Sequence, residues 1–455
     1  LKCHKPKASN MKSKRICIIG AGLSGLSLAW KKENLGHEVQ IIESASRVGG
    51  VLQSKYIEGY LLDYGANSLS LRHQDTYDTL SQMGVIDHAI DADSITNKRF
   101  IVRNGKLVAL PLGIPSFFIS SFLSPWGKLR LLLEPLISKG NQDAKESVAS
   151  FISRRLGKEA LDFAANPFIS GIYASKPETL NLANAFPSLF QLEQQSGSLF
   201  LGMLKKGNKR KCIPKTRLIS FPKGMCQLTE LIASSLRKTS IKTEESVVSV
   251  EKTLSSWRIA TQSLSGEKSV FECDEIISTL PIQKSITIDW KNLTASEKLS
   301  DLHQVTHYPL SLAYFGVDRA MIKHALDGFG FLVPEKENLS ILGTLFSSTL
   351  FPQRAPNGKV LLTTFVGGER RPDLALASED EIYRVVYEDL SKLIGLQGKP
   401  EFFHLKRWKQ SIPLPDDKMN LRKQAADVLS QANEGLFFSG SAFTGVSLPN
   451  CIGSN

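Results

Sequence analysis

Residues 15–50, RICIIGAGLSGLSLAWKKENLGHEVQIIESASRVGG, decide the fold of this chain. An apolar strand ending at Ile19 runs into the turn Gly20-Ala-Gly-Leu-Ser-Gly25, and a helix and a second strand lead on to Glu43. In such a turn the first glycine permits the bend, the second lets the backbone approach a pyrophosphate, and the third lets helix pack on strand. The helix start attracts phosphate, and an acid about twenty residues on can accept hydrogen bonds from a ribose. This order of elements predicts a dinucleotide site rather than a purely structural glycine turn.

The four residues Arg47-Val-Gly-Gly50 follow the second strand and help to choose the dinucleotide. Two adjacent glycines let the chain turn closely around a diphosphate, and the arginine is a positive donor. A basic, flexible loop is the alternative interpretation. The pattern resembles the two-glycine signature of the FAD-dependent oxidase group that contains amine oxidases and protoporphyrinogen oxidases. We therefore expect FAD rather than NAD.

Composition limits the possible partners. The 455 residues are 42% hydrophobic, which suits two or three domains with large cores. The net charge of +12 lies mainly in two acid-free segments, 1–15 and 205–217. Such segments are usually solvated, but they also suit an anionic membrane surface or an acidic small molecule. Because no basic array is interleaved with aromatic residues, nucleic acid is not expected as a partner.

The six cysteines are scattered without a CxxC pair. This is typical of a reducing compartment and argues against a zinc or iron–sulfur site. His303 and His307 have an i, i+4 spacing but no evident third ligand, so no metal is expected. The basic N-terminus does not lead into a plain apolar core, so we expect no signal peptide and a cytoplasmic protein. One more helix is expected after Ser454.

The longest uncharged run, Leu107–Gly127, contains Pro111, Pro115 and Pro125. Prolines at this density argue against an uninterrupted membrane-spanning helix. Large apolar residues continue through a mostly helical stretch from Ser116 onward. Any that stay exposed would mark a membrane-facing or ligand-channel surface, so we expect peripheral association with the cytoplasmic face of a membrane.

The expected fold class is α/β, or α+β overall, built from three units. Residues 11–75, 218–285 and 405–455 are expected to form one discontinuous, Rossmann-like FAD domain, because the final apolar strand returns to the first sheet in proteins of this group. Residues 90–205 are expected to form a helical domain that associates with a membrane or lines a channel. Residues 286–404 are expected to form a β-rich substrate-binding domain.

Two local patterns predict element ends. Asn104-Gly105 is a hairpin turn signal between apolar runs. Ser378 as N-cap, Glu381 completing a capping box and Gly395 as a stop predict an amphipathic helix.

Blocks from Ile16 to the C-terminus resemble the oxygen-dependent protoporphyrinogen oxidase family. The most specific are FISGIYA at 168–174 and AFPSLFQLE at 185–193, and GFGFLVP at 328–334 and GVSLPNC at 445–451 agree with them. The resemblance implies a six-electron oxidation of a porphyrinogen to the porphyrin in heme biosynthesis, with O₂ as acceptor and three H₂O₂ formed. In such an enzyme FAD performs the difficult step while the protein orients the substrate.

The same resemblance implies roles for single residues. Arg99 would pair with a substrate propionate, for which a planar guanidinium fork is suited. Gly171 would lie beside the reacting tetrapyrrole, while Phe329 and Leu332 would sandwich its rings. Their alternatives are a surface arginine, a helix-break glycine and plain core packing. No residue is assigned as catalytic. The implied FAD contacts are Gly20, Ala21, Gly22, Leu23, Ser24, Gly25, Glu43, Ser44, Arg47, Gly50, Gly65, Ala66, Asn67, Ser68, Val247, Ser441, Val446, Ser447 and Leu448.

Some features keep alternatives open. Gly440-Ser441 stands where many FAD domains have Gly-Asp; protoporphyrinogen oxidases commonly lack this aspartate, so its absence favours the resemblance. Asn67 stands where some members have arginine. The related oxidase of coproporphyrinogen III, which has four carboxylates, is favoured by the basic segment 205–217 and disfavoured by the apolar run Leu107–Gly127. An amine oxidase or carotenoid desaturase would share the nucleotide turn only. A non-catalytic flavin- or porphyrin-binding protein and a homodimer also remain open.

Overall fold

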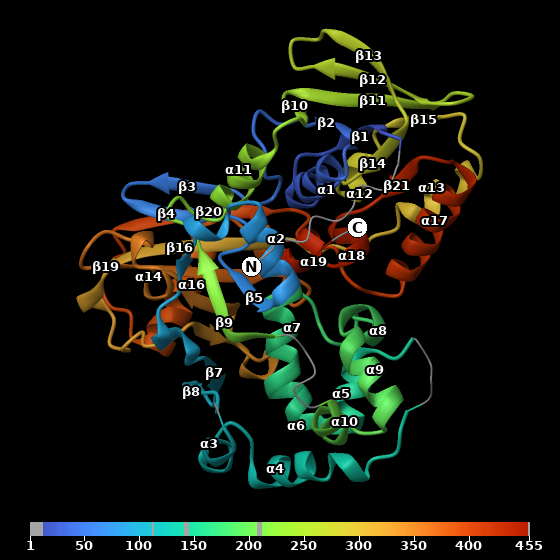
Figure 1. Ribbon diagram of the computed structural model, residues 1–455. Helices are drawn as coiled ribbons and strands as arrows, with labels where there is room; N and C mark the ends of the chain where they lie inside the picture. Colours follow the sequence, from blue (N-terminus) through green and yellow to red (C-terminus); the bar gives the residue numbers. More distant parts are fainter. Residues whose placement is uncertain (1–11, 112, 141–144, 207–211, 454–455) are drawn as a thin grey trace.

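The computed structural model describes residues 12–111, 113–140, 145–206 and 212–453. Within these ranges the chain forms β-sheets of five, four, seven, two and three strands, with helices packed around them. Figure 1 shows the five-stranded sheet at the upper right, the seven-stranded sheet at the left and a helical block below both. The mixed α/β class predicted from the sequence is confirmed.

The five-stranded sheet is entirely parallel and collects strands from distant parts of the chain. The two strands that come first in the chain lie next to each other in this sheet, and the glycine-rich turn follows the first of them. The pairing Ile16↔Val39 on one side and Ile16↔Glu275 on the other fixes the register. In spatial order the strands are β10 (Ser240–Lys242), β2 (Glu38–Ile42), β1 (Arg15–Ile19), β14 (Glu275–Ser278) and β21 (Leu436–Phe438).

Both faces of this sheet are covered, as parallel sheets require. One face packs on α1 (Leu23–Asn34), α11 (Cys226–Ser235) and α19 (Leu448–Gly453), with Ile18 and Leu26 in the shared core. The other face packs on a four-stranded sheet through Cys17 and Trp257. The strands of that sheet are β13 (Lys268–Cys273), β12 (Trp257–Ser263), β11 (Glu245–Lys252) and β15 (Asp289–Lys291).

The seven-stranded sheet lies beside the parallel sheet and includes a hairpin from the range 90–205. That hairpin turns at Asn104-Gly105, both with positive φ, as the sequence predicted. Its first strand pairs in parallel with the strand carrying Leu332, so part of the range expected to be helical belongs to this sheet. In order the strands are β20 (Phe402–Trp408), β16 (Leu310–Asp318), β19 (Lys359–Gly367), β18 (Ile341–Phe346), β17 (Gly330–Leu332), β7 (Phe100–Arg103) and β8 (Lys106–Ala109).

Helix α16 (Glu379–Ile394) packs on this sheet. It begins after Ser378, whose side chain accepts the Glu381 N–H, and ends at Gly395 with φ of 66°. These are the ends that the capping pattern predicted. Other elements outside the helical block include β3 (Ser54–Ile57), β4 (Tyr60–Asp63), β5 (Leu69–His73), α2 (Gln74–Gln82), β6 (Ile90–Asp91), β9 (Cys212–Ser220), α17 (Lys418–Ala432) and α18 (Ser441–Thr444).

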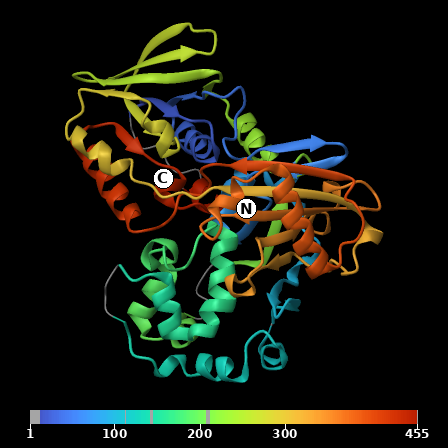
Figure 2. The ribbon, with the colours of Figure 1, turned by 180° about the vertical axis from the view of Figure 1, so that it is seen from behind.

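The helical block lies at one end of the molecule, below both large sheets in Figure 1 and in the reverse view of Figure 2. Arg155 lies fully buried in it between Glu134 and Glu193. A π-helical turn over Leu161–Ala165 precedes α7 (Asn166–Tyr173). The other helices are α3 (Ile114–Ile119), α4 (Pro125–Leu132), α5 (Val148–Leu156), α6 (Lys158–Ala160), α8 (Leu182–Ala185), α9 (Pro187–Ser196) and α10 (Leu199–Lys206).

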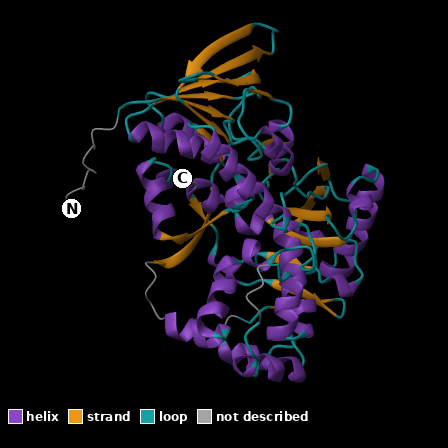
Figure 3. Ribbon diagram, turned by 90° about the vertical axis from the view of Figure 1, so that its right-hand side faces the viewer, coloured by secondary structure: helices purple, strands orange, loops and turns teal. Residues whose placement is uncertain are grey.

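Figure 3 separates the helices of this block from the strands above it by colour. Among the described residues, every helix is too short or too polar to cross a membrane.

Candidate flavin and substrate site

The three glycines of the nucleotide turn differ in the space around them. A Cβ atom on Gly25 would lie 2.0 Å from the carbonyl oxygen of Gly20, so helix and strand touch there. Gly20 itself has φ of +103°, which disfavours other residues. Gly22 has no heavy atom within 4 Å of such a Cβ. The turn is therefore closed at its base and open at Gly22, which fits the approach of a pyrophosphate.

The start of α1 also fits an anionic ligand. No side chain caps this helix, and its first turn contains no acidic residue. The backbone N–H groups of a helix start carry partial positive charge. Glu43, at the end of β2, accepts the N–H of Ala21 at 2.8 Å and that of Ala45 at 2.9 Å. These bonds hold the carboxylate at the edge of the turn, where a ribose would be expected.

The segment Arg47–Gly50 packs against the nucleotide turn. The Gly49 N–H donates to the carbonyl of Ala21 at 2.8 Å, and a Cβ on Gly50 would lie 3.3 Å from Cα of Gly22. The Arg47 guanidinium donates to the carbonyls of Val48 at 2.9 Å and Gly50 at 2.7 Å. Arg47 thus stabilises its own loop through these hydrogen bonds. It also supplies the positive charge that the sequence suggested. Ser44, just before it, is exposed.

The turn Gly65–Ser68 runs beside this loop. A Cβ on Gly65 would lie 2.4 Å from the carbonyl oxygen of Val51, so only glycine allows this approach. Ala66, Asn67 and Ser68 are half-buried. The side-chain amide nitrogen of Asn67 lies 3.5 Å from the carbonyl oxygen of Gly65, a marginal contact that leaves the amide able to bind a ligand.

A lysine that the sequence reasoning missed lies near this turn. Lys406 Nζ is 5.2 Å from the ring centroid of Tyr64 and 4.6 Å from that of Trp408. Burial and the repulsion of Arg47 lower the pKa of Lys406. Lys406 thus adds a second cation to the Arg47 side of the expected cofactor site. In the sequence, Lys406 is recognisable only as a lysine within a run that otherwise forms a strand.

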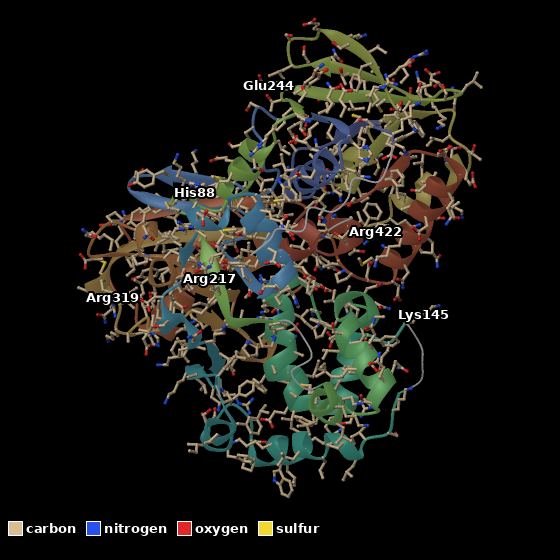
Figure 4. All side chains as sticks on the ribbon, viewed as in Figure 1. His88, Lys145, Arg217, Glu244, Arg319 and Arg422 are labelled. Carbon is tan, nitrogen blue, oxygen red and sulfur yellow. The ribbon has the colours of Figure 1, made fainter. Side chains whose placement is uncertain are left out.

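The last turn of the chain, where contacts to the flavin are expected, packs against the first helix. Ser441 begins α18 and is exposed, while Val446 and Leu448 are half-buried and Ser447 is exposed. Leu448 packs against the core that contains α1, so the last turn meets the first helix. The buried Arg422, labelled in Figure 4, donates to the carbonyls of Gln304 at 2.6 Å, Leu414 at 3.3 Å and Ala442 at 3.4 Å, which anchors α18.

Val247 is half-buried on β11 and packs on the core beneath the parallel sheet. It lies two residues after Glu245, whose N–H donates to the Glu43 carbonyl at 3.0 Å. The remaining expected contacts, from the β1–α1 turn through Arg47–Gly50 to the last turn, surround the N-terminal end of α1. Their glycines, free helix N–H groups and cations are the donor set that a dinucleotide needs. The residues present therefore fit FAD.

The four residues expected at the substrate lie around β17 and the start of β7, two neighbouring strands of the seven-stranded sheet. The Arg99 guanidinium lies 4.8 Å from the ring centroid of Phe329, and the Phe329 N–H donates to the Lys98 carbonyl at 2.8 Å. Burial and the nearby Arg72 lower the pKa of Arg99. Its guanidinium makes no ion pair with any described residue, so it is available for a carboxylate.

Gly171 meets Leu332 on the same side. A Cβ on Gly171 would lie 2.6 Å from Cδ2 of Leu332, so α7 passes close over β17. Both residues are partly accessible, whereas their neighbours Ser170 and Val333 are buried. The two residues therefore form one wall of an apolar surface.

Strand pairing identifies two further residues on this wall. Leu332 lies opposite Gly343, which in turn lies opposite Phe365; Leu345 lies opposite Gly330. Paired residues project to the same face of a sheet, so the half-buried Leu345 and Phe365 lie on the face that carries Leu332. At the two glycines a Cβ would lie within 2.6 Å of the neighbouring strand's backbone. Sequence reasoning missed Leu345 and Phe365, although glycines inside strands were a signal that something approaches closely.

Histidine and cysteine side chains take no part in this arrangement. Among the described residues no three metal-ligating side chains gather. Burial lowers the pKa of both His303 and His307, which favours their neutral forms.

Comparison with known proteins agrees with these features. The family model for flavin containing amine oxidoreductases matches residues 23–454. Mitochondrial protoporphyrinogen oxidase of Nicotiana tabacum is 34% identical over 475 residues, covering 97% of this chain and 93% of its own. Coproporphyrinogen III oxidase of Bacillus subtilis (strain 168) is 27% identical over 460 residues, covering 96% of each.

Solved structures share the fold over nearly the whole chain. A protein from Exiguobacterium sp. 255-15 superimposes with a TM-score of 0.76 at 21% identity, covering 98% of this chain and 97% of its own. A reduced UDP-galactopyranose mutase gives 0.71 at 14% identity, covering 97% and 92%. The resemblance inferred from the sequence is thus confirmed: the chain belongs to the flavin-containing amine oxidoreductases, as an FAD-dependent oxidoreductase homologous to the protoporphyrinogen oxidases.

Proposed function

We propose that this protein oxidises protoporphyrinogen IX to protoporphyrin IX in heme biosynthesis, with O₂ as acceptor and three H₂O₂ formed for six electrons removed. The observation that carries the proposal is the convergence of Arg99, Phe329, Leu332 and Gly171 around β17 of the seven-stranded sheet. The relative from Nicotiana tabacum, named as this oxidase, supports it at 34% identity.

Each of these residues has a defined role in the proposal. Arg99 binds a propionate carboxylate through its planar fork. Leu332 and Phe329 hold the ring system flat and keep water from it. Gly171 allows the tetrapyrrole to approach the backbone of α7. Bound FAD supplies a hydride acceptor that O₂ can reoxidise, so the reaction requires no acid–base pair from the protein.

Oxidation of coproporphyrinogen III is the second candidate, and one observation favours it. Arg72 lies close enough to Arg99 to lower its pKa, so a second cation is present for further carboxylates. The basic segment 205–217 gives less support than the sequence suggested. Arg217, labelled in Figure 4, already pairs with Asp91 at 2.8 Å, and residues 207–211 lie outside the described residues.

A direct assay decides between these functions. Purified protein with FAD is mixed in air with each porphyrinogen, and porphyrin fluorescence and H₂O₂ are recorded. We expect a higher kcat/KM for protoporphyrinogen IX, with three H₂O₂ formed for each porphyrin. A strong preference for coproporphyrinogen III would establish the second candidate. Flavin that keeps its absorbance when mixed anaerobically with both substrates would instead indicate a non-catalytic carrier.

We also propose that the helical block rests on an anionic membrane surface. Its outer edge, along α3, α4 and the residues after them, exposes a cluster of large apolar side chains. Contiguous exposed apolar area of this kind marks an interaction surface. The cluster consists of Phe118, Ile119, Trp126, Leu129, Leu132, Leu133 and Leu136.

Co-sedimentation with vesicles of anionic and neutral lipid tests this surface. Trp126 is 78% exposed and Leu136 is also 78% exposed, so changing both to serine should abolish binding without harming the fold. Leu254→Ser is the matched control, because this fully exposed leucine lies between β11 and β12, which Figure 1 shows at the end of the molecule opposite the helical block. Binding by the double variant equal to that of the parent would refute the assignment.

The three units predicted from the sequence need one adjustment in this proposal. We propose that the substrate-binding unit includes the hairpin of β7 and β8, because it pairs with β17. The hairpin places Arg99, immediately before β7, next to Phe329.

A further inference from the structure

Arg370 occupies an unusual position between the elements that carry the proposed substrate residues. Its guanidinium donates from Nη1 to the carbonyl of Val333 at 2.6 Å. From Nη2 it donates to Asn166 Oδ1 at 2.6 Å and to Ser170 Oγ at 2.7 Å. Val333 directly follows Leu332, and Ser170 directly precedes Gly171. One side chain therefore joins β17 to α7 at the point where they meet.

The charge of this arginine is not neutralised by its direct partners. All three acceptors are uncharged, and Nε has no hydrogen-bond partner among the described residues. Burial lowers the pKa of Arg370 to about 10, and only Glu335 raises it. Glu335 is itself bound to Lys176 at 2.8 Å. Burying a cation in this way costs free energy, and what Arg370 provides in return is a hydrogen-bonded link between β17 and α7.

The rest of the turn after β19 holds α7 in the same way. The N–H of Glu369 donates to the carbonyl of Ala174, which ends the helix in a left-handed conformation. The Glu369 carboxylate accepts from Ser175 Oγ at 2.6 Å and from the Lys176 N–H at 2.8 Å. In Figure 1, α7 runs from the helical block toward the sheets. The turn after β19 is thus the contact that sets where this helix lies on the sheet.

We propose that Arg370 is a positioning residue that sets the distance between Gly171 and Leu332, and so the width of the slot for the tetrapyrrole. The inference rests on the proposed function, because it takes these two residues as the slot wall. Arg370 itself touches neither substrate nor cofactor. Its effect on the rate arises because small misplacements of a bound substrate slow a reaction by up to roughly a hundredfold.

Arg370→Met tests this, since methionine keeps the apolar stem and removes all three hydrogen bonds. The measurement is the rate constant of flavin reduction by protoporphyrinogen IX under anaerobic conditions, with FAD content and melting temperature recorded beside it. We expect the rate constant to fall by about tenfold or more at a temperature where the variant is folded and fully loaded. Arg370→Lys should recover only part of the rate, because an ammonium lacks the planar fork.

Arg407→Met is the matched control. Arg407 also donates two hydrogen bonds to backbone carbonyls, those of Ala375 at 2.9 Å and Ala377 at 2.5 Å, but it does not contact α7. Its loss should change the melting temperature and leave the reduction rate within about twofold, the scale of ordinary context effects. A decrease like that of Arg370→Met would show that any lost arginine in this sheet has the same effect, which would overturn the proposal.

A double-mutant cycle separates positioning from general destabilisation. If Arg370 acts through Leu332, the loss in rate from Arg370→Met and Leu332→Ala together should be clearly smaller than the product of the two separate losses. With Arg99→Ala, which removes the carboxylate anchor, the effects should multiply. Independent effects of Arg370 and Leu332, or a parent-like rate for Arg370→Met, would overturn this inference alone. Failure of the unaltered protein to be reduced by any porphyrinogen would count against the proposed function instead.

Discussion

Gly171 and Leu332 are so close that a single methyl group on the glycine would lie 2.6 Å from a leucine methyl. Gly171 is in α7 and Leu332 ends β17, so this contact determines how near helix and sheet come at the proposed substrate slot. The leucine methyl is the free end of a side chain and can move. An added methyl would therefore displace Leu332 into the slot rather than unfold the helix.

Gly171→Ala should accordingly impair the enzyme without destabilising it. Alanine favours a helix over glycine by up to about 1 kcal/mol, so the melting temperature should be unchanged or higher, while KM rises by about tenfold. Gly202→Ala is the control: its methyl would lie 2.6 Å from Leu192 Cδ1 within the helical block, away from the slot. A KM unchanged by Gly171→Ala would remove this residue from the site.

Gly22→Ala should separate cofactor binding from folding. The space around Gly22 is open and its φ of −72° suits alanine, so the apo-protein should melt at the parental temperature. The methyl would stand where the pyrophosphate approaches, so the Kd for FAD should rise about tenfold or more. A tenfold rise corresponds to a loss of roughly 1.4 kcal/mol in binding free energy. Gly25→Ala should instead prevent folding, because its methyl would lie 2.0 Å from a backbone oxygen. FAD titration with an unchanged Kd for Gly22→Ala would contradict this placement.

Arg99→Ala should raise KM for protoporphyrinogen much more than it lowers kcat, because a carboxylate anchor supplies mainly uniform binding. Losing a charge-assisted hydrogen bond of about 1.5–3 kcal/mol corresponds to a rise of about tenfold or more. Lys98→Ala is the neighbouring control, since Lys98 is already paired with Asp327 at 2.5 Å. Steady-state kinetics with equal KM for Arg99→Ala and the parent would exclude Arg99.

Local patterns predicted much of the fold because their causes are local. The turn Gly20–Gly25, the hairpin at Asn104-Gly105 and the helix from Glu379 to Ile394 each depend on neighbouring residues, and all three are present. Fold class followed from the order of such elements. The pairing of β7 with β17 did not, because it joins residues more than two hundred positions apart and leaves no periodic pattern.

The candidate site shows the same difference between what local patterns predict and what depends on contacts between distant residues. The residues placed by resemblance lie together, but the groups that support them were not predictable. Arg370, Lys406 and Arg72 matter because of what they approach in space, and an isolated basic residue looks the same in a sequence whether it is solvated or buried. Leu345 and Phe365 become visible only once the strand register is known.

Acid should weaken the helical block through Glu193. Burial alone would raise the pKa of this carboxyl, but hydrogen bonds from Arg154 and Arg155 outweigh it and hold the pKa below its ordinary value of 4.5. A lowered pKa in the folded state adds stability above the unfolded pKa, and this stability is lost as pH falls through the folded value. Melting curves of the parent should therefore shift to lower temperature below about pH 4.5.

Glu193→Gln should remove this dependence and be costly at neutral pH. The substitution breaks one of the two buried ion pairs of Arg155 and leaves the pair with Glu134 at 3.1 Å, so we expect a cost of about 1.5–3 kcal/mol in the free energy of unfolding, the scale of a hydrogen bond to a charged group. Because acid protonates Glu193 in the parent, the stability difference between the two proteins should narrow as pH falls. Glu388→Gln, which breaks an exposed pair with Arg384 at 3.2 Å, should cost less than about 1 kcal/mol. A stability difference between Glu193→Gln and the parent that is constant from pH 7 to about pH 3 would contradict the assigned linkage.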